Sequence, residues 1–146
     1  MADIIPLLGI RKFRWVSSSE RKEGAGAKGW IHTVGPVQRK MLLIEGGLKA
    51  DIVNHFTGQS LIAVPGVNAL SELESTLLEY KQQGLREIET CFDMDYLRNH
   101  NVDQAYMKLL SLMKKLDIPC KTCLWNPVFN GMDDYLRSKN SDTSKV

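Results

Sequence analysis

The segment Met41-Leu42-Leu43-Ile44-Glu45-Gly46-Gly47-Leu48-Lys49-Ala50-Asp51 decides the fold. Its first four residues form a continuous apolar run, which is typical of a parallel strand buried on both faces. The run stops abruptly at Glu45 and two glycines. Residues 48–56 then place apolar side chains at helical spacing on one face. A buried strand that leads directly into a helix is the start of a βαβ unit.

The same alternation continues along the chain. We expect further strands at residues 60–64, 87–92 and 118–125, and helices at 71–80, 101–116 and 133–137. Ser71 with Glu74, and Asn101 with Gln104, have the spacing of helix-capping pairs. The order βαβαβαβ predicts an α/β domain over residues 40–137. We expect a Rossmann-like, parallel four-stranded sheet with helices on both faces and right-handed crossovers.

The segments outside this domain differ in composition. Residues 1–39 read as an irregular arm or hairpin with short strands at best, and residues 138–146 as a polar, disordered tail. Residues 1–40 carry eight Lys or Arg and three Asp or Glu. The basic side chains alternate with aromatic ones, a composition that suits phosphate pairing and base stacking. We therefore predict a nucleic-acid contact, and the alternative is a solvated basic hairpin whose aromatics pack on the domain. The candidate residues are Arg11, Lys12, Arg14 and Trp15.

Bulk properties exclude several classes of protein. No apolar run approaches the ~20 residues that cross a bilayer, so no membrane partner is expected. The first 15 residues lack the order of a signal peptide. The chain has three cysteines, Cys91, Cys120 and Cys123, and an odd, small number argues against a disulfide framework. We expect a cytoplasmic protein in which Cys120 and Cys123, three residues apart in a strand, are core residues on opposite faces.

Acidic side chains fall where the predicted strands end. Glu45 ends the first strand, and Asp93 and Asp95 end the third. Ligands of open α/β sheets bind beyond the carboxyl ends of the strands. Residues two apart in extended chain point to the same side, and Mg²⁺ prefers carboxylate oxygens, water and phosphate as ligands. The three acids together predict a divalent metal site, although each alone could be a helix-start or turn residue.

These residues resemble a known family. Residues 41–51 followed by Cys91-Phe92-Asp93-Met94-Asp95 are similar to the Toprim domain of bacterial primases, type IA and II topoisomerases and some nucleases. In particular, the chain resembles a Toprim-like domain of uncharacterised function in primase and replication proteins of phages, plasmids and integrative elements. That domain has a Glu-Gly-x-x-Lys-Ala-Asp motif, matched by residues 45–51, and a late Gly-x-Asp-Asp-Tyr-Leu motif, matched by residues 131–136.

The resemblance implies roles for individual residues. Glu45 would handle the proton of the attacking or leaving oxygen, and Asp93 and Asp95, with Glu45, would hold Mg²⁺ or Mn²⁺. Asp133, Asp134 and Asp51 are candidates for further carboxylates beyond the direct ligands. The implied function is that of a Mg²⁺-dependent domain of a DNA replication or primase-type protein of a mobile element. It would act on nucleic-acid or nucleotide phosphates by nucleotidyl transfer or phosphodiester hydrolysis.

Two departures from the family leave alternatives open. Typical primases have an acid four residues after the motif Glu, and Lys49 stands there instead, as in some type IA topoisomerases. One helical turn beyond Glu45, Lys49 could reach a phosphate or the Glu itself as a catalytic residue, or face solvent. A chain of 146 residues cannot contain a whole primase or topoisomerase, so it is either a fragment of a larger replication protein, which we expect, or a stand-alone piece. The alternatives are a non-catalytic Toprim scaffold that binds nucleic acid or protein, and an unrelated doubly wound domain that binds a small phosphate ligand.

Overall fold

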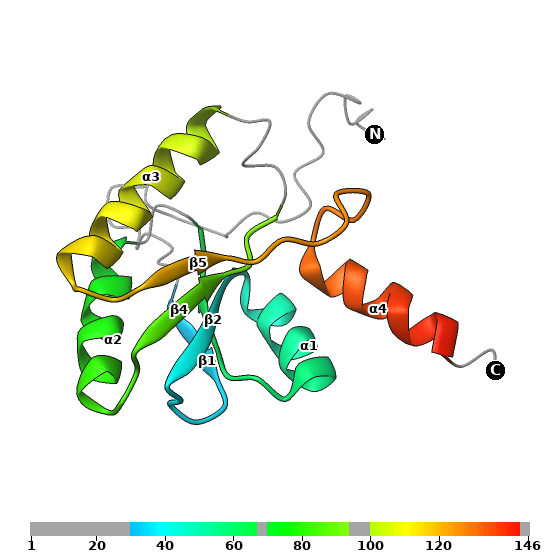
Figure 1. Ribbon diagram of the computed structural model, residues 1–146, viewed down its shortest axis with the longest axis horizontal. Coiled ribbons are helices and arrows are strands. Elements are labelled where there is room, and N and C mark those ends of the chain that lie inside the picture. Colours follow the sequence, from blue (N-terminus) through cyan, green and yellow to red (C-terminus); the bar gives the residue numbers. More distant parts are fainter. Residues whose placement is uncertain (1–29, 67–69, 94–99, 144–146) are drawn as a thin grey trace, which may run out of the picture.

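A five-stranded sheet organises the computed structural model, which describes residues 30–66, 70–93 and 100–143. The strands lie in the order β1-β3-β2-β4-β5 (Figure 1). The four parallel strands confirm the predicted sheet, and β1 pairs antiparallel with β3 as a fifth strand at one edge. The end of the N-terminal arm therefore belongs to the sheet. The strands are β1 (His32–Val34), β2 (Lys40–Glu45), β3 (Leu61–Val64), β4 (Glu87–Thr90) and β5 (Cys120–Thr122).

Helices cover both faces of the sheet, as predicted from the strand and helix order. They are α1 (Gly47–Thr57), α2 (Leu70–Gln82), α3 (His100–Lys115) and α4 (Met132–Thr143). Helices α2 and α3 lie together on one side, and α1 and α4 contact each other on the other side (Figure 1). None of the helices that the structure describes is long and apolar enough to cross a membrane.

Strand β2 supplies side chains to both hydrophobic cores. Met41 and Leu43 pack in the cluster beneath α2 and α3, and Leu42 and Ile44 pack in the cluster beneath α1 and α4. All four are at most 2% exposed. Successive side chains of a strand point to opposite faces, so a four-residue apolar run is what a strand between two helical layers requires.

The last helix is longer than the sequence indicated. Residues 138–143, expected to be disordered, extend α4 to Thr143, and residues 144–146 lie outside the described part of the chain. The Ser138 and Ser141 hydroxyls donate to backbone carbonyls of preceding helical residues, at 2.7 Å and 3.0 Å. The Lys139 ammonium lies 4.8 Å from the centre of the Tyr135 ring. These local contacts stabilise a helix that composition alone did not indicate.

The capping pair predicted for α2 is not formed as expected. Helix α2 begins at Leu70, so Ser71 lies inside its first turn and donates to Glu72 Oε2 at 2.7 Å. Glu74 instead pairs with Lys115 of α3 at 2.8 Å. Helix α3 begins at His100, one residue before the expected cap. The ion pair to α3 replaces the local cap, a contact that sequence spacing does not reveal.

A buried hydroxyl cluster fixes α3 against the sheet. The Tyr106 hydroxyl of α3 lies 3.0 Å from the Thr90 hydroxyl at the end of β4, and it also hydrogen-bonds the Thr122 hydroxyl of β5. Thr90 in turn donates to the Lys121 carbonyl at 3.3 Å. The cluster joins three elements immediately before the chain enters residues 91–93, so it stabilises the edge of the sheet where the acids lie.

Replacing Tyr106 by Phe should destabilise the protein by about 1–3 kcal/mol, because the buried Thr90 hydroxyl and the Thr122 hydroxyl each lose a partner. Chemical denaturation followed by circular dichroism measures this change. Tyr80→Phe is the matched control, because Tyr80 is half-buried. This substitution should lower the free energy of unfolding by less than about 0.5 kcal/mol. Equal losses in the two variants would show that the cluster contributes nothing specific.

Candidate metal centre

The carboxyl ends of β2, β3 and β4 lie side by side. The Gly46 amide donates to the Val64 carbonyl at 2.9 Å, and the Cys91 amide donates to the Leu43 carbonyl at 2.7 Å. These bonds continue the parallel ladder past the assigned strand ends, which brings Glu45 and Asp93 to the same edge. Gly46 has φ +93°, a conformation that favours glycine. It turns the chain from β2 directly into α1, so Lys49 lies in the first turn of the helix above this edge.

Asp93 contacts two other residues of the described part of the site. Its Oδ2 accepts from Lys49 Nζ at 2.5 Å and from Asn130 Nδ2 at 3.3 Å. Its Oδ1 is buried and has no hydrogen-bond partner among the described residues. The two oxygens of this carboxylate therefore differ, since one is neutralised by the chain and the other is not.

Asp133 presents a second oxygen of the same kind. The residue lies in the first turn of α4 and is 8% exposed, and its Oδ1 is buried without a partner within the described chain. A Cβ atom placed at Gly131 would overlap Asp133 Oδ1 and lie 3.4 Å from Asp93 Oδ1. Both oxygens therefore face one small space that exists because residue 131 has no side chain.

The chemistry of these two oxygens suits a cation. Buried polar atoms are almost always hydrogen-bonded, and a buried unpaired carboxylate is costly. Two carboxylates that share a site repel each other, and a divalent ion relieves that repulsion. Carboxylate oxygens are the ligands that Mg²⁺ and Mn²⁺ prefer, so the donor chemistry is suitable.

A loop braced by its own hydrogen bonds positions Asn130 and Gly131. The buried Trp125 donates from its indole nitrogen to the Phe129 carbonyl at 2.7 Å. Asn126 accepts from Phe129 through its backbone at 3.0 Å and from Val128 through its side chain at 3.1 Å. These bonds close the loop before α4 begins, so the amide of Asn130 is held against Asp93.

The other predicted site residues that the structure describes differ in their surroundings. Glu45 is half-buried at the end of β2, and Asp134 is exposed on α4. Asp51 pairs with His32 of β1 at 2.9 Å, with both side chains about half exposed. Asp95 and the arm residues Arg11, Lys12, Arg14 and Trp15 lie outside the described residues. Within residues 30–66, 70–93 and 100–143, no three His, Cys, Asp or Glu side chains form a group that could hold a metal.

Sequence reasoning missed Asn130 as a partner of Asp93 and gave Gly131 no separate role. The contact joins residues 37 positions apart, and no periodicity links a loop amide to a strand-end acid. The available signal was the Asn130-Gly131 pair just before two acids. Such a pair marks a tight turn that can point side chains at a neighbouring strand end.

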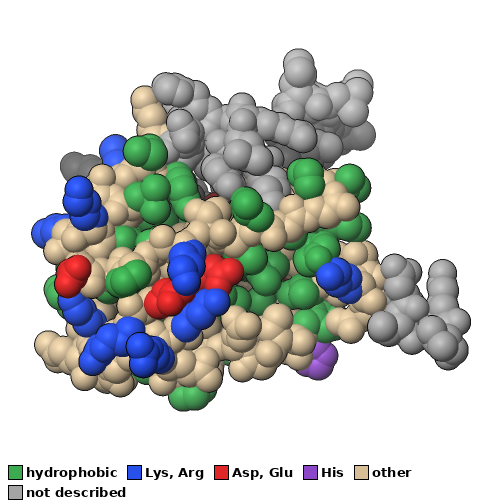
Figure 2. Space-filling view, in the orientation of Figure 1, with side chains coloured by type: hydrophobic (Ala, Val, Ile, Leu, Met, Phe, Trp, Pro, Cys, Tyr) green, Lys and Arg blue, Asp and Glu red, His purple; other side chains and the backbone are tan. Residues whose placement is uncertain are grey.

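Away from this edge, basic side chains are balanced by acids. Figure 2 shows Lys and Arg side chains beside Asp and Glu side chains on one face of the molecule. Lys40 pairs with Glu89, and Lys121 pairs with Glu87 at 3.0 Å. These pairs join neighbouring strands, so they are accounted for by sheet packing.

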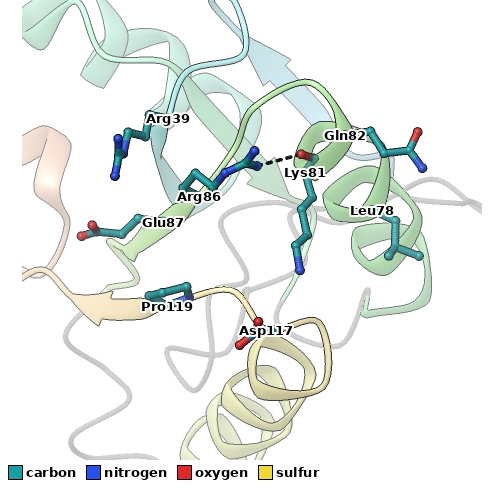
Figure 3. A pocket seen from close by; sticks show the side chains of 8 residues that line it. All are labelled: Arg39, Leu78, Lys81, Gln82, Arg86, Glu87, Asp117 and Pro119. Carbon is teal, nitrogen blue, oxygen red and sulfur yellow. Dashed lines mark hydrogen bonds between the residues drawn. The ribbon is translucent and has the colours of Figure 1, made fainter.

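A hollow of about 860 Å³ opens at the amino edge of the sheet, opposite the acids (Figure 3). The Arg86 guanidinium donates to the Lys81 carbonyl at 3.0 Å, and the Lys81 ammonium donates to the Leu116 carbonyl at 2.7 Å. Cations at helix C-termini satisfy the last carbonyls and the helix dipole. The basic lining of this hollow therefore has a structural role.

Two cysteines lie side by side just after the ends of β4 and β5. Thr90 pairs with Thr122, and the Cys123 amide donates to the Thr90 carbonyl at 2.8 Å, so Cys91 and Cys123 follow on adjacent strands. The hydrogen bond from the Cys91 thiol lowers the pKa of Cys123, whereas burial raises the pKa of Cys120 to about 11. Cys120 and Cys123 pack against opposite hydrophobic clusters, which confirms the expected placement on opposite faces.

Comparisons with known proteins agree with this fold. A family model described as "Domain of unknown function (DUF3854)" matches residues 30–143, and no curated protein matches the chain. The primase fragment of the bacteriophage T7 primase-helicase is similar, with a TM-score of 0.51, 14% identity, and coverage of 73% of this chain and 43% of that one. A second similar chain comes from a structure of the bacteriophage T7 lagging-strand DNA polymerase interacting with primase domains of two gp4 subunits bound to an RNA/DNA hybrid and dTTP. Its TM-score is 0.50 and its sequence identity 14%, and the match covers 73% of this chain and 52% of that one.

At this identity the likeness shows the fold alone. The chain has a primase-like α/β fold and spans about half, or less, of the length of the structures that it resembles.

Iodoacetamide should modify Cys123 faster than Cys120 at pH 8, because the thiolate is the reactive form and the pKa of Cys123 is the lower one. Peptide mass spectrometry after timed labelling at several pH values measures both rates. Cys91→Ala removes the donor and should move Cys123 labelling to higher pH, whereas Cys91→Ser keeps a donor. Labelling of Cys123 that is indifferent to both variants would contradict this assignment.

Proposed function

The chain belongs to the family described as domain of unknown function DUF3854, and we propose a function for it. We propose that the chain is a Mg²⁺-dependent Toprim domain of a replication or primase-type protein of a mobile element. Its substrates would be nucleic-acid or nucleotide phosphates, and DNA its main partner. One observation carries the proposal: Asp93 and Asp133 each direct a buried carboxylate oxygen, without a partner among the described residues, at the space above Gly131.

The residues proposed to hold the ion come from three segments. Asp93 and Asp95 follow β4, Glu45 ends β2, and Asp133 begins α4. We propose Asp93, Asp95 and Glu45 as ligands, with Asp133 closing the site from the opposite side. The primase-like fold and the motifs at residues 45–51, 93–95 and 131–136 support this assignment.

A Mg²⁺ ion bound here would neutralise charge on the phosphate oxygens of a substrate. Glu45, half-buried at the same edge, would accept or return the proton of the attacking or leaving oxygen. Lys49 adds a positive charge from the first turn of α1, where it can also attract a phosphate. The basic arm, with Arg11, Lys12, Arg14 and Trp15, would hold the nucleic-acid strand through phosphate contacts and stacking.

A second candidate function is a non-catalytic scaffold that binds nucleic acid or protein. The observation that favours it is coverage: the chain matches only 43% and 52% of the lengths of the chains that it resembles. In this alternative, the ion and acids organise the edge of the sheet, and other domains of a replication protein contribute the reaction.

Asp93→Asn should weaken Mn²⁺ or Mg²⁺ binding by about 10- to 100-fold or more, the range seen when even a supporting metal-site contact is lost. Amide NMR during a Mg²⁺ titration measures binding, with shifts expected at Glu45, Asp93 and Gly131. Asp51→Asn is the matched control, because Asp51 pairs with His32 instead and should leave the affinity unchanged.

Equal losses in both variants, or no saturable binding to the wild type at tens of millimolar metal, would contradict the metal site and favour an unrelated phosphate-binding domain. If binding depends on Asp93, nuclease and primer-synthesis assays on the same chain separate the two candidate functions. Turnover that Asp93→Asn abolishes supports an enzyme. Metal binding without turnover supports the scaffold.

Gly131→Ala should also weaken metal binding by at least about tenfold, because its methyl group would occupy the space between the two carboxylates. Overpacking of this kind costs about 1–3 kcal/mol of stability, so the variant should remain folded. Gly66→Ala is the control, since no atom of the described residues lies within 4 Å of its added Cβ. Calorimetric titration with Mn²⁺ measures the affinity of both variants. If Gly131→Ala binds Mn²⁺ as tightly as the wild type, the ion does not bind between Asp93 and Asp133.

A further inference from the structure

Lys49 brings a positive charge of the chain itself to the carboxylate proposed to hold the metal. Its ammonium lies 2.5 Å from Asp93 Oδ2, and the two side chains are 33% and 23% exposed. An ion pair this sheltered is screened less by salt than a surface pair. Any divalent ion that binds Asp93 must therefore coexist with this ammonium or displace it.

The contacts of Asp93 separate these two possibilities. Oδ2 already accepts from both Lys49 and Asn130, whereas Oδ1 is buried, has no partner among the described residues and faces the space shared with Asp133. A cation on the Oδ1 side leaves the Lys49 pair intact. A second cation on the Oδ2 side would have to replace the ammonium and the amide together.

Charge repulsion also disfavours a second divalent ion beside Asp93. A unit charge and a divalent ion roughly 5 Å apart repel enough, even in a water-like dielectric, to change an affinity by about tenfold. Two divalent ions beside the same ammonium would each bear this cost. Enzymes that use two metals clamp the attacking and leaving oxygens with two bound cations, and here the ammonium occupies one side of the central carboxylate.

We propose that Lys49 takes the place of a second metal ion, so that the centre admits one divalent ion, on the Oδ1 side of Asp93 towards Asp133. This inference rests on the proposed metal-dependent function and specifies its stoichiometry. The chemistry at this site is then of the one-metal type, with the ammonium as the second positive charge available to a phosphate.

A purely structural role for Lys49 makes a different prediction. If the ion pair only fastened α1 to the segment after β4, its loss would lower stability and leave metal affinity and stoichiometry unchanged. Metal counting therefore separates the two roles, and stability alone does not.

The test counts Mn²⁺ bound to the whole chain, with free Mn²⁺ measured by electron paramagnetic resonance. Wild type should bind one ion that Asp93→Asn removes. Lys49→Met should bind a second ion, or bind the first about tenfold more tightly. Lys49→Arg keeps the charge and should match the wild type, as should Lys114→Met, which removes an exposed lysine at the far end of α3.

Two ions bound to the wild type, or an unchanged number and affinity in Lys49→Met, would overturn the proposal while leaving an Asp93-dependent metal site in place. If neither the wild type nor any Lys49 variant binds Mn²⁺, the proposed function itself fails. If only Lys49→Met binds Mn²⁺, the ammonium excludes all metal from the wild-type site, which overturns the proposed single ion beside an intact Lys49 pair.

Thermal unfolding covers the case in which Lys49→Met is too unstable for metal counting. The proposal expects a lower melting temperature without metal, because Asp93 loses its counter-ion, and a larger increase on adding Mn²⁺ than in the wild type. Lys49→Gln, which keeps a hydrogen-bond donor without the charge, should behave in the same way. Failure of Mn²⁺ to restore either variant would overturn the proposal in favour of a structural ion pair.

Discussion

The burial of β2 between β3 and β4 is the constraint on which the rest of the structure depends. Met41 to Ile44 are at most 2% exposed, and complete burial of one such side chain stabilises a fold by about 1.5–3 kcal/mol. Because these side chains alternate between faces, a strand of this kind is stable only when helices cover both sides. The strand also fixes the site, since Glu45 is its last residue and Gly46 turns the chain straight into α1.

Electrostatics at the carboxyl edge follow from this placement. Asp93 is brought beside the first turn of α1, where Lys49 neutralises one of its oxygens. Its other oxygen and that of Asp133 remain buried, without partners among the described residues. Helix N-termini favour negative charge, and Asp133 lies in the first turn of α4. The dipole lowers the cost of burying this carboxylate, but it does not relieve the repulsion between two acids that face one space.

Much of the fold was predictable because it rests on local pattern. The apolar runs and helical spacing of residues 41–56 indicated β2 and α1, and acids after strands indicated the edge where Glu45 and Asp93 lie. Asn130, Gly131 and the Cys91–Cys123 pair were not predictable as contacts, because tertiary folding alone brings them together. The strand pairing of His32–Val34 was equally hidden, since three residues are too few to show alternation. The length of α4 was underestimated because its last turns are polar and stabilised by hydroxyl and cation–π contacts.

The packing of α1 against α4 explains both the motif at residues 45–51 and the motif at residues 131–136. Lys49 comes from the first turn of α1 and Asp133 from the first turn of α4, and these helices contact each other on one face of the sheet. Later in each helix, Val53, Tyr135 and Leu136 pack in the same hydrophobic cluster. Each motif therefore combines a charged residue at a helix start with apolar residues that fix the helix direction. The position of Asp133 relative to Lys49 depends on this helix pair, so packing on that face and the charges at the edge are physically coupled.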